Sequence, residues 1–221
     1  MSPNHHLDQA TILAYAAGTL APAFSVVIGS HVALCAICRA AMRSAQALGG
    51  ELVSGLPAAA VSAACRTRTM AMLDGATLHR FPAPRHAPSH APSEIPAPLA
   101  ALLPATSLAE LRWKKMVPGV ALFDVAISGQ PKGQLMLLRV GPGRAVPEHG
   151  HGGEEVTLVL AGAYRDRLGR FARGDVAELD ADIEHQPIAE GDLDCICLVA
   201  IEKPTRFKSV VARLLQPFVG I

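Results

Sequence analysis

The chain has 221 residues, a formal net charge of +1 and hydrophobic side chains at half of its positions, and this length suits one large domain or two small ones. Its basic residues are scattered, so no electrostatic footprint for nucleic acid is visible and we expect no direct contact with DNA. No uninterrupted apolar run approaches the roughly 20 residues that span a bilayer, which argues against a membrane protein.

The beginning of the chain, residues 1–6, lacks a basic stretch followed by an apolar one and so does not resemble a secretory signal. The five cysteines are an odd number and include a C-x-x-C pattern. This usage is more typical of metal or redox chemistry in a reducing compartment than of a disulfide framework. We therefore expect the protein in the cytoplasm.

Apolar residues recur at helical spacing in three segments before residue 78. Leu7–Ala17 is followed by a turn at residues 18–22 and a second run, Ala23–Leu48, so the two predict a helical hairpin. The glycine pair at residues 49–50 is expected to end the second helix, and Ala58–Leu73 predicts a third. Residues 1–78 are therefore expected to form a domain of three or four helices.

The composition changes at residues 79–98, where prolines are interleaved with alanine, serine and histidine. A stretch so rich in proline cannot build a core and is typical of an extended linker. We expect the domain boundary here, with a second domain over residues 99–221.

After the linker, apolar residues come in short runs of strand length that are separated by glycine-containing turns. This pattern predicts an all-β sandwich or barrel. The last segment, Arg206–Phe218, is compatible with a terminal helix or an edge strand. The predicted fold class is thus two domains, one helical and one all-β, and the clearest strand segments are Val120–Ile127, Gln134–Val140, Glu155–Leu160 and Leu193–Ile201.

The second predicted helix carries the pattern His31-x3-Cys35-x2-Cys38. In a helix of about 100° per residue these positions fall within roughly 60° of one another, so the three side chains share a face. An imidazole and two thiolates suit tetrahedral zinc, which takes a fourth protein ligand in structural sites. Structural zinc contributes on the order of 10 kcal/mol of folding free energy, which would offset the thin core of so small a unit. The alternative is that the cysteines are merely small buried residues and His31 a satisfied polar group.

The hairpin indicates the fourth ligand. With its turn near Leu20, the second helix returns beside the residues that precede the first, which brings His6 close to the His31–Cys38 segment. We predict His6 as the fourth ligand of a structural zinc. His5 is the alternative, and Cys65 is a third candidate from the next helix.

A second pattern runs from Gly143 to Gly162 and contains His149, His151 and Glu155. Its fixed positions resemble the first motif of the cupin family. Residues two apart in a strand share a face, so both histidines are expected to point into the barrel, and Glu155 returns on the next strand.

A further histidine, His185, lies eleven residues after Gly174, at the spacing of the second cupin motif. Asp180, Asp182 and Ala189 stand where that motif has proline, glycine and asparagine, so only the ligand of this half is kept. Three imidazoles and a carboxylate suit zinc or another divalent transition metal. The alternative is a relic site, with the histidines kept as polar barrel residues.

Cys195 and Cys197 lie two apart in an apolar strand and therefore share one face. They are candidates for oxidation if that face lines the metal cavity. The alternative is that both are inert core residues.

Taken together, the histidine and cysteine pattern with His6, the proline-rich linker and the cupin-like pattern with His185 resemble the ChrR-like family of zinc-binding anti-sigma factors over nearly the whole chain. The resemblance implies that the helical domain, folded around zinc, binds an extracytoplasmic-function sigma factor and covers the surfaces with which it engages core RNA polymerase. It also implies that the cupin domain responds to oxidative stress, such as singlet oxygen, and releases the sigma factor.

The residues agree with parts of this resemblance. Leu13, Tyr15, Phe24 and Val27 are expected to be packed in the helical core or to face a partner. We find no additional acid, base or nucleophile in a recognisable arrangement, so we expect no enzymatic activity. The alternative function is a cupin-type metal-dependent oxygenase with an N-terminal regulatory domain.

Overall fold

The computed structural model describes residues 2–74, 94–131 and 134–204 and the backbone of residues 206–207. The chain divides into two compact units, of which one combines Met1–Gly49 with Glu94–Ile221 and the other is Gly50–Ser93. Most of the expected linker lies outside the described residues, and its boundaries stay a prediction. The larger unit contains both predicted metal-binding patterns.

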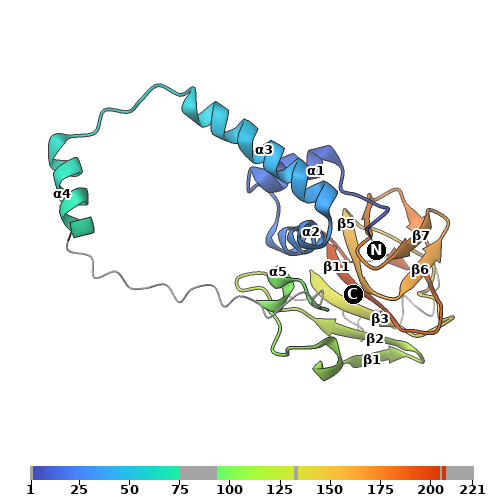
Figure 1. The fold of residues 1–221 in the computed structure, drawn as a ribbon. Helices are drawn as coiled ribbons and strands as arrows, with labels where there is room; N and C mark the ends of the chain where they lie inside the picture. The colour runs from blue at the N-terminus through green and yellow to red at the C-terminus, as the bar shows by residue number, and fades with distance from the viewer. Residues whose placement is uncertain (1, 75–93, 132–133, 205, 208–221) are drawn as a thin grey trace. The chain divides into compact units, whose positions relative to one another are not determined.

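Five α-helices lie in the described residues (Figure 1). The Asp8 side chain caps the first helix by accepting a hydrogen bond from the amide of Ala10 at 2.7 Å. Pro22 is the first residue of the second helix, a position whose backbone N–H makes no hydrogen bond within the helix, so proline is tolerated there. The helices are α1 (Gln9–Ala16), α2 (Pro22–Leu34), α3 (Ala36–Ser54), α4 (Ala63–Asp74) and α5 (Ala97–Ala100), and a short 3₁₀ turn covers Leu108–Glu110.

The expectation of one helix over Ala23–Leu48 is wrong, because the chain turns a corner at Cys35. This residue has extended backbone angles (φ −104°, ψ 116°), and the axes of α2 and α3 differ by 115°. Its N–H still bonds to the carbonyl of His31 at 2.8 Å, so α2 ends in a regular last turn. The corner lets α2 lie against the sheet while α3 departs from it (Figure 1).

The glycine pair at residues 49–50 does not end α3, which continues to Ser54. A glycine stop requires a left-handed backbone, and neither glycine has a positive φ. Glycine inside a helix costs about 1 kcal/mol relative to alanine, which a long helix tolerates. The third predicted helix is present as α4, but it begins at Ala63 instead of Ala58.

The remainder of the larger unit is built from short antiparallel strands, as predicted. The four clearest predicted strand segments are present as β2 (Val120–Asp124), β3 (Leu135–Val140), β5 (Glu155–Ala161) and β11 (Cys195–Ile201). Of the last segment, only Arg206–Phe207 is described, as a strand; the rest lies outside the described residues. The strands are β1 (Lys114–Val117), β2 (Val120–Asp124), β3 (Leu135–Val140), β4 (His149–Gly150), β5 (Glu155–Ala161), β6 (Ala163–Asp166), β7 (Gly169–Ala172), β8 (Val176–Leu179), β9 (Glu184–His185), β10 (Ile188–Glu190), β11 (Cys195–Ile201) and β12 (Arg206–Phe207).

The largest sheet has the order β1-β2-β3-β11-β5-β8, and two three-stranded sheets, β10-β6-β7 and β12-β4-β9, accompany it. The neighbours β3, β11 and β5 are consecutive in space but far apart in sequence, which is typical of antiparallel sandwiches and barrels. The predicted fold class, a helical region followed by an all-β cupin-like domain, is confirmed.

The central strands β5 and β11 of the large sheet are buried on both faces, and α2 contacts both of them. Along β11, Ile196, Leu198 and Ala200 pack in a core with residues of α2 and α5, whereas Cys195 and Cys197 face a second core between the sheets. Helix α2 therefore covers one face of these central strands.

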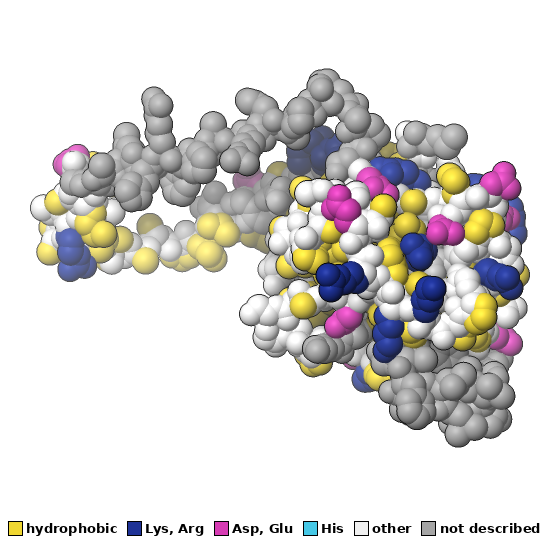
Figure 2. All heavy atoms as spheres, turned by 90° about the horizontal axis from the view of Figure 1, so that it is seen from below, with side chains coloured by type: hydrophobic (Ala, Val, Ile, Leu, Met, Phe, Trp, Pro, Cys, Tyr) yellow, Lys and Arg dark blue, Asp and Glu magenta, His cyan; other side chains and the backbone are white. Residues whose placement is uncertain are grey.

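No single helix in the described ranges is long and apolar enough to cross a bilayer; α2 and α3 pass the length and composition test only together, across their 115° bend. On the face of the larger unit in Figure 2, basic and acidic side chains are interspersed.

Candidate metal centres

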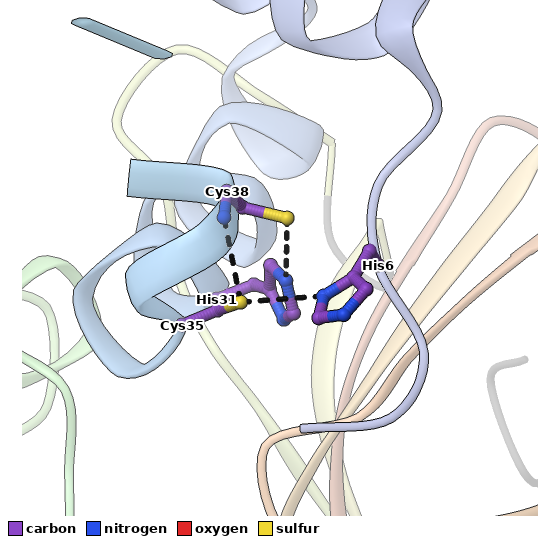
Figure 3. Close-up of side chains that lie close together, drawn as sticks. All are labelled: His6, His31, Cys35 and Cys38. Carbon is purple, nitrogen blue, oxygen red and sulfur yellow. Dashed lines mark hydrogen bonds between the residues drawn. The ribbon is translucent and has the colours of Figure 1, made fainter. Parts of the chain in front are cut away.

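Four potential metal ligands converge where the N-terminal segment meets the corner between α2 and α3 (Figure 3). His31 lies in the last turn of α2, Cys35 forms the corner, Cys38 lies in the first turn of α3, and His6 precedes α1. Their ligand atoms all lie within 4.8 Å of one another. We call this group the helical cluster.

The spacing of the helical cluster fits zinc. The Nε2 atom of His31 lies 3.2 Å from Sγ of Cys38, and Sγ of Cys35 lies 3.3 Å from Nδ1 of His6. In a tetrahedral site with zinc bonds of about 2.3 Å to sulfur and about 2.05 Å to nitrogen, such atoms are about 3.5 Å apart. Two thiolates and two imidazoles therefore suit zinc in both chemistry and distance.

The three ligands of the His-x3-Cys-x2-Cys pattern converge, but the reason given from the sequence is wrong. They do not share the face of one continuous helix, because the chain turns at Cys35. The corner itself aims the sulfurs: the N–H of Cys38 donates to Sγ of Cys35 at 3.4 Å in the turn that opens α3.

His6 lies in the helical cluster, whereas His5 lies against the barrel, and the role of His6 as the fourth ligand stays a prediction. The ring of His5 stacks on Phe171 at a centroid distance of 4.2 Å, and its Nε2 lies 3.1 Å from the carbonyl oxygen of Arg170. Cys65 belongs to α4, in the smaller unit. His6 is also the exposed member of the helical cluster, whose other three residues are buried.

Burial sets the protonation states of two members of the helical cluster. It lowers the pKa of His31 to about 4, so this imidazole is neutral near pH 7. It raises the pKa of Cys38 to about 11, and the neighbouring Cys35 contributes in the same direction. Zinc binds neutral imidazole and thiolate, so its binding here would release the proton of Cys38.

A second group, the barrel cluster, consists of His149, His151 and His185, all buried. His149 of β4 lies directly opposite His185 of β9, and their Nε2 atoms are 3.1 Å apart. The Nε2 atom of His151 is buried and has no hydrogen-bond partner within the described part of the chain. The ligand nitrogens of the three rings lie within 4.8 Å of one another and form a donor set that suits a divalent transition metal.

The outer nitrogen of each barrel histidine is held by a fixed partner. Nδ1 of His185 lies 2.8 Å from a carboxylate oxygen of Asp166, and Nδ1 of His149 lies 2.8 Å from the carbonyl oxygen of Pro147. Such partners fix the ring orientation and leave Nε2 for a metal. Asp166 was not identified from the sequence, because it lies at the end of β6, outside both motif-like segments.

The carboxylate of Glu155 lies behind His151, with Oε2 at 3.1 Å from Nδ1 of that ring. Its other oxygen accepts a hydrogen bond from the hydroxyl of Thr157 at 2.9 Å. Burial opposes ionisation of Glu155, but the hydrogen bond from His151 and the charges of the neighbouring histidines outweigh it and hold its pKa below the usual range. Burial lowers the pKa of His149. The role of Glu155 as a ligand stays a prediction.

The sulfurs of Cys195 and Cys197 lie 3.7 Å apart, and both residues are buried. The hydrogen bond between the two thiols and burial raise the pKa of Cys197 well above its ordinary value. Both side chains belong to the core between the sheets, together with Tyr164. A protonated, buried thiol reacts slowly with oxidants, which favours the inert alternative.

Each cluster lies beside a depression in the protein surface. A cleft of about 730 Å³ next to His185 is lined mainly by charged side chains, among them Glu148, Arg165, Arg167 and Glu190. A groove of about 420 Å³ next to Cys38 runs between α1 and α3 and is mostly apolar.

Comparisons with known proteins agree with this architecture. Residues 104–203 match the ChrR Cupin-like domain family. The chain is 41% identical to the anti-sigma-E factor ChrR of Cereibacter sphaeroides over 221 residues, which is the full length of both. It is also similar to a chain in the crystal structure of Rhodobacter sphaeroides SigE in complex with the anti-sigma ChrR, with a TM-score of 0.76 and 37% identity over 91% of this chain and 100% of that one.

Proposed function

The chain belongs to the ChrR family of anti-sigma factors, and on that premise we propose that it binds an extracytoplasmic-function sigma factor and keeps it from core RNA polymerase. The observation that carries the proposal is the full-length identity to a protein named an anti-sigma factor. The related ChrR chain is described in complex with SigE, which indicates the class of partner.

The proposed contact surface is the apolar groove beside Cys38 together with the stripe on α3 that borders it. Ile37, Ala41, Ala45 and Leu48 recur at helical spacing and line the groove, with Ile37 60% and Leu48 55% exposed. Leu13 of α1, 43% exposed, lines the same groove. Large apolar side chains exposed in one row are typical of a surface that accepts an amphipathic helix of a partner.

We propose that the helical cluster holds structural zinc, as predicted from the sequence. Zinc there would join the N-terminal segment to both sides of the α2–α3 corner and so keep α1 and α3 on either side of the groove. The donor set and the spacing of about one tetrahedral edge support this assignment.

We propose that the barrel cluster holds zinc or another divalent transition metal, and that oxidative stress of the singlet-oxygen type acts on this domain to release the sigma factor. The fixed outer partners of His149 and His185 and the orphaned Nε2 of His151 support a metal here. Cys195 and Cys197 are the weaker candidates for the oxidised group, since both residues are buried.

The proposal places the protein in the cytoplasm, where sigma factors meet RNA polymerase. It treats the chain as a regulator and not as an enzyme, in keeping with the name of its relative.

An exchange of one exposed side chain tests the contact surface. Ile37→Glu puts a charge into the apolar stripe, and we expect at least a 100-fold loss of affinity for the cognate sigma factor, measured by calorimetry with purified full-length proteins. Leu193→Glu is the matched control, because Leu193 is 72% exposed and lies before β11, away from the groove. Equal affinities for the two variants would contradict the proposed surface.

Illumination in the presence of a photosensitiser tests the sensing role. We expect singlet oxygen to dissociate the wild-type complex, whereas a complex formed with His151→Ala should stay intact over the same exposure. Size-exclusion chromatography before and after illumination distinguishes the two. Release from the variant at the wild-type rate would show that the barrel cluster does not receive the signal.

A further inference from the structure

A buried carboxylate of the barrel holds the segment that carries His6. Asp175, in the turn between β7 and β8, is 1% exposed. Its Oδ1 accepts hydrogen bonds from the backbone N–H groups of Asn4 at 2.6 Å and His5 at 3.0 Å, and its Oδ2 accepts one from the N–H of Ala172 at 2.8 Å. One carboxylate therefore closes its own turn and captures two consecutive amides of the N-terminal segment.

The N-terminal segment is anchored on both sides of the ligand. Before it, Pro3 packs against Gly174, where an added Cβ would approach the proline ring to 3.0 Å. After it, the N–H of Asp8 donates to a carboxylate oxygen of Glu178 at 2.6 Å. These contacts join residues about 170 positions apart in the sequence, from the N-terminal segment to the β7–β8 region.

The same turn also touches a second member of the helical cluster. The Nδ1 atom of His31 lies 2.9 Å from the carbonyl oxygen of Gly174, and both groups are buried. This hydrogen bond places the proton on Nδ1 and leaves Nε2 free to face the helical cluster. His6 and His31 come from different elements, yet both depend on the β7–β8 turn for their positions.

The β7–β8 turn is in turn bonded to the strand behind the barrel cluster. The N–H of Gly174 donates to the carbonyl of Val159 in β5 at 2.8 Å, and the N–H of Val159 donates to the carbonyl of Asp175 at 3.0 Å. The first residue of β5 is Glu155, which contacts His151. Only the stretch of β5 from Glu155 to Val159 therefore separates the β7–β8 turn from the residue that contacts the barrel cluster.

We infer that Asp175 is a positioning residue of the helical cluster, which holds His6 in place through the amides of Asn4 and His5. His6 is exposed and lies outside any helix, so these contacts supply the order that a metal ligand needs. The barrel thereby sets how firmly the helical cluster keeps its metal. This inference rests on the metal site of the proposed function and is independent of sigma factor binding.

The test uses the full chain loaded with Co²⁺ in place of zinc. Thiolate-to-cobalt charge transfer reports only the helical cluster, because the barrel cluster contains no cysteine. The loss of this absorption after addition of excess EDTA measures metal release. We expect release about 10- to 100-fold faster from Asp175→Ala than from the wild type, the range typical of lost outer partners of metal ligands. Asp175→Asn keeps one acceptor oxygen, so its rate of cobalt release should lie between those of the wild type and Asp175→Ala.

Two further variants separate positioning from general damage. A chain that lacks residues 2–5 removes the captured amides without altering the barrel, and it should release cobalt as fast as Asp175→Ala. Asp180→Ala is the control, because the Asp180 carboxylate accepts a hydrogen bond from the N–H of Asp182 within a turn of the same barrel. This variant should release cobalt at the wild-type rate.

The outcomes are distinguishable. Wild-type release rates in both Asp175→Ala and the shortened chain would overturn the inference and leave the proposed metal site standing. A wild-type chain that shows no thiolate-to-cobalt absorption would overturn both. Equal acceleration by Asp180→Ala would assign the effect to a loosened barrel and also overturn the inference.

Discussion

Four imidazoles in the two clusters present Nε2 inward and give Nδ1 to a fixed partner. For His31 that partner is the carbonyl of Gly174, and for His185 it is the carboxylate of Asp166. The outer contacts orient the rings before any metal binds, which lowers the entropy lost on binding. For His151 the partner is Glu155, which the sequence had already indicated as a candidate site residue.

At the residue scale, Cys38→Ala should abolish metal binding at the helical cluster and release the sigma factor. The variant removes one of two thiolates, and the three remaining ligands cannot close a tetrahedral site. Metal analysis after gel filtration should show one equivalent fewer than in the wild type, and the sigma factor should elute separately.

Cys65→Ala is the matched control for Cys38→Ala. It removes a cysteine from α4, outside the helical cluster, and should retain both the metal and the sigma factor. If Cys38→Ala still bound the sigma factor with wild-type affinity, zinc would have no part in shaping the contact surface.

At the scale of elements, the α2–α3 corner gives the two helices different surroundings. Val27 and Ile28 of α2 are fully buried, whereas Ile37 and Leu48 of α3 are more than half exposed. The four residues expected to be packed or partner-facing differ in exposure: Phe24 and Val27 are buried, Leu13 is exposed and Tyr15 is partly buried.

Leu99→Ala should destabilise the larger unit by about 2–5 kcal/mol, the range for truncating a buried leucine. Leu99 of α5 is fully buried in the core that α2 and α5 share with the outer face of the sheet. Urea unfolding followed by circular dichroism measures the change. Leu193→Ala, at a 72% exposed position, should stay within about 0.5 kcal/mol of the wild type. Equal stabilities would contradict the described packing of α5.

At the scale of the whole molecule, the helices and the barrel share one core. Leu158 of β5 and Leu198 of β11 are fully buried on the face that α2 covers, while Val159 and Cys197 point to the other side. The two metal clusters therefore lie in one compact unit, and the β7–β8 turn connects them.

A fragment that comprises residues 94–221 should expose the apolar sheet face that α2 covers in the full chain. We expect it to bind the dye ANS with strongly increased fluorescence and to elute as an oligomer in size-exclusion chromatography, unlike the full chain. A monomeric fragment without ANS fluorescence would contradict the shared core.

The sequence by itself determined the fold class, the main strands and the residue types of both clusters. Strands and ligand patterns are local: short apolar runs between glycine-containing turns and spacings such as His-x-His extend over a few residues, so they can be recognised along the chain. The antiparallel return of a hairpin also predicted that His6 lies near the His31–Cys38 segment, and its role as a metal ligand stays a prediction.

Only the tertiary structure decided the corner at Cys35, the docking of α2 on the sheet, and the outer partners Gly174, Asp166 and Asp175. These features depend on contacts between residues far apart in the chain, such as Asn4 with Asp175. Apolar residues recur on both sides of Cys35 in the sequence, so nothing local marks the corner. Contacts between distant residues separate the two helices, because α2 packs against β5 and β11 whereas α3 buries only Cys38 and Met42.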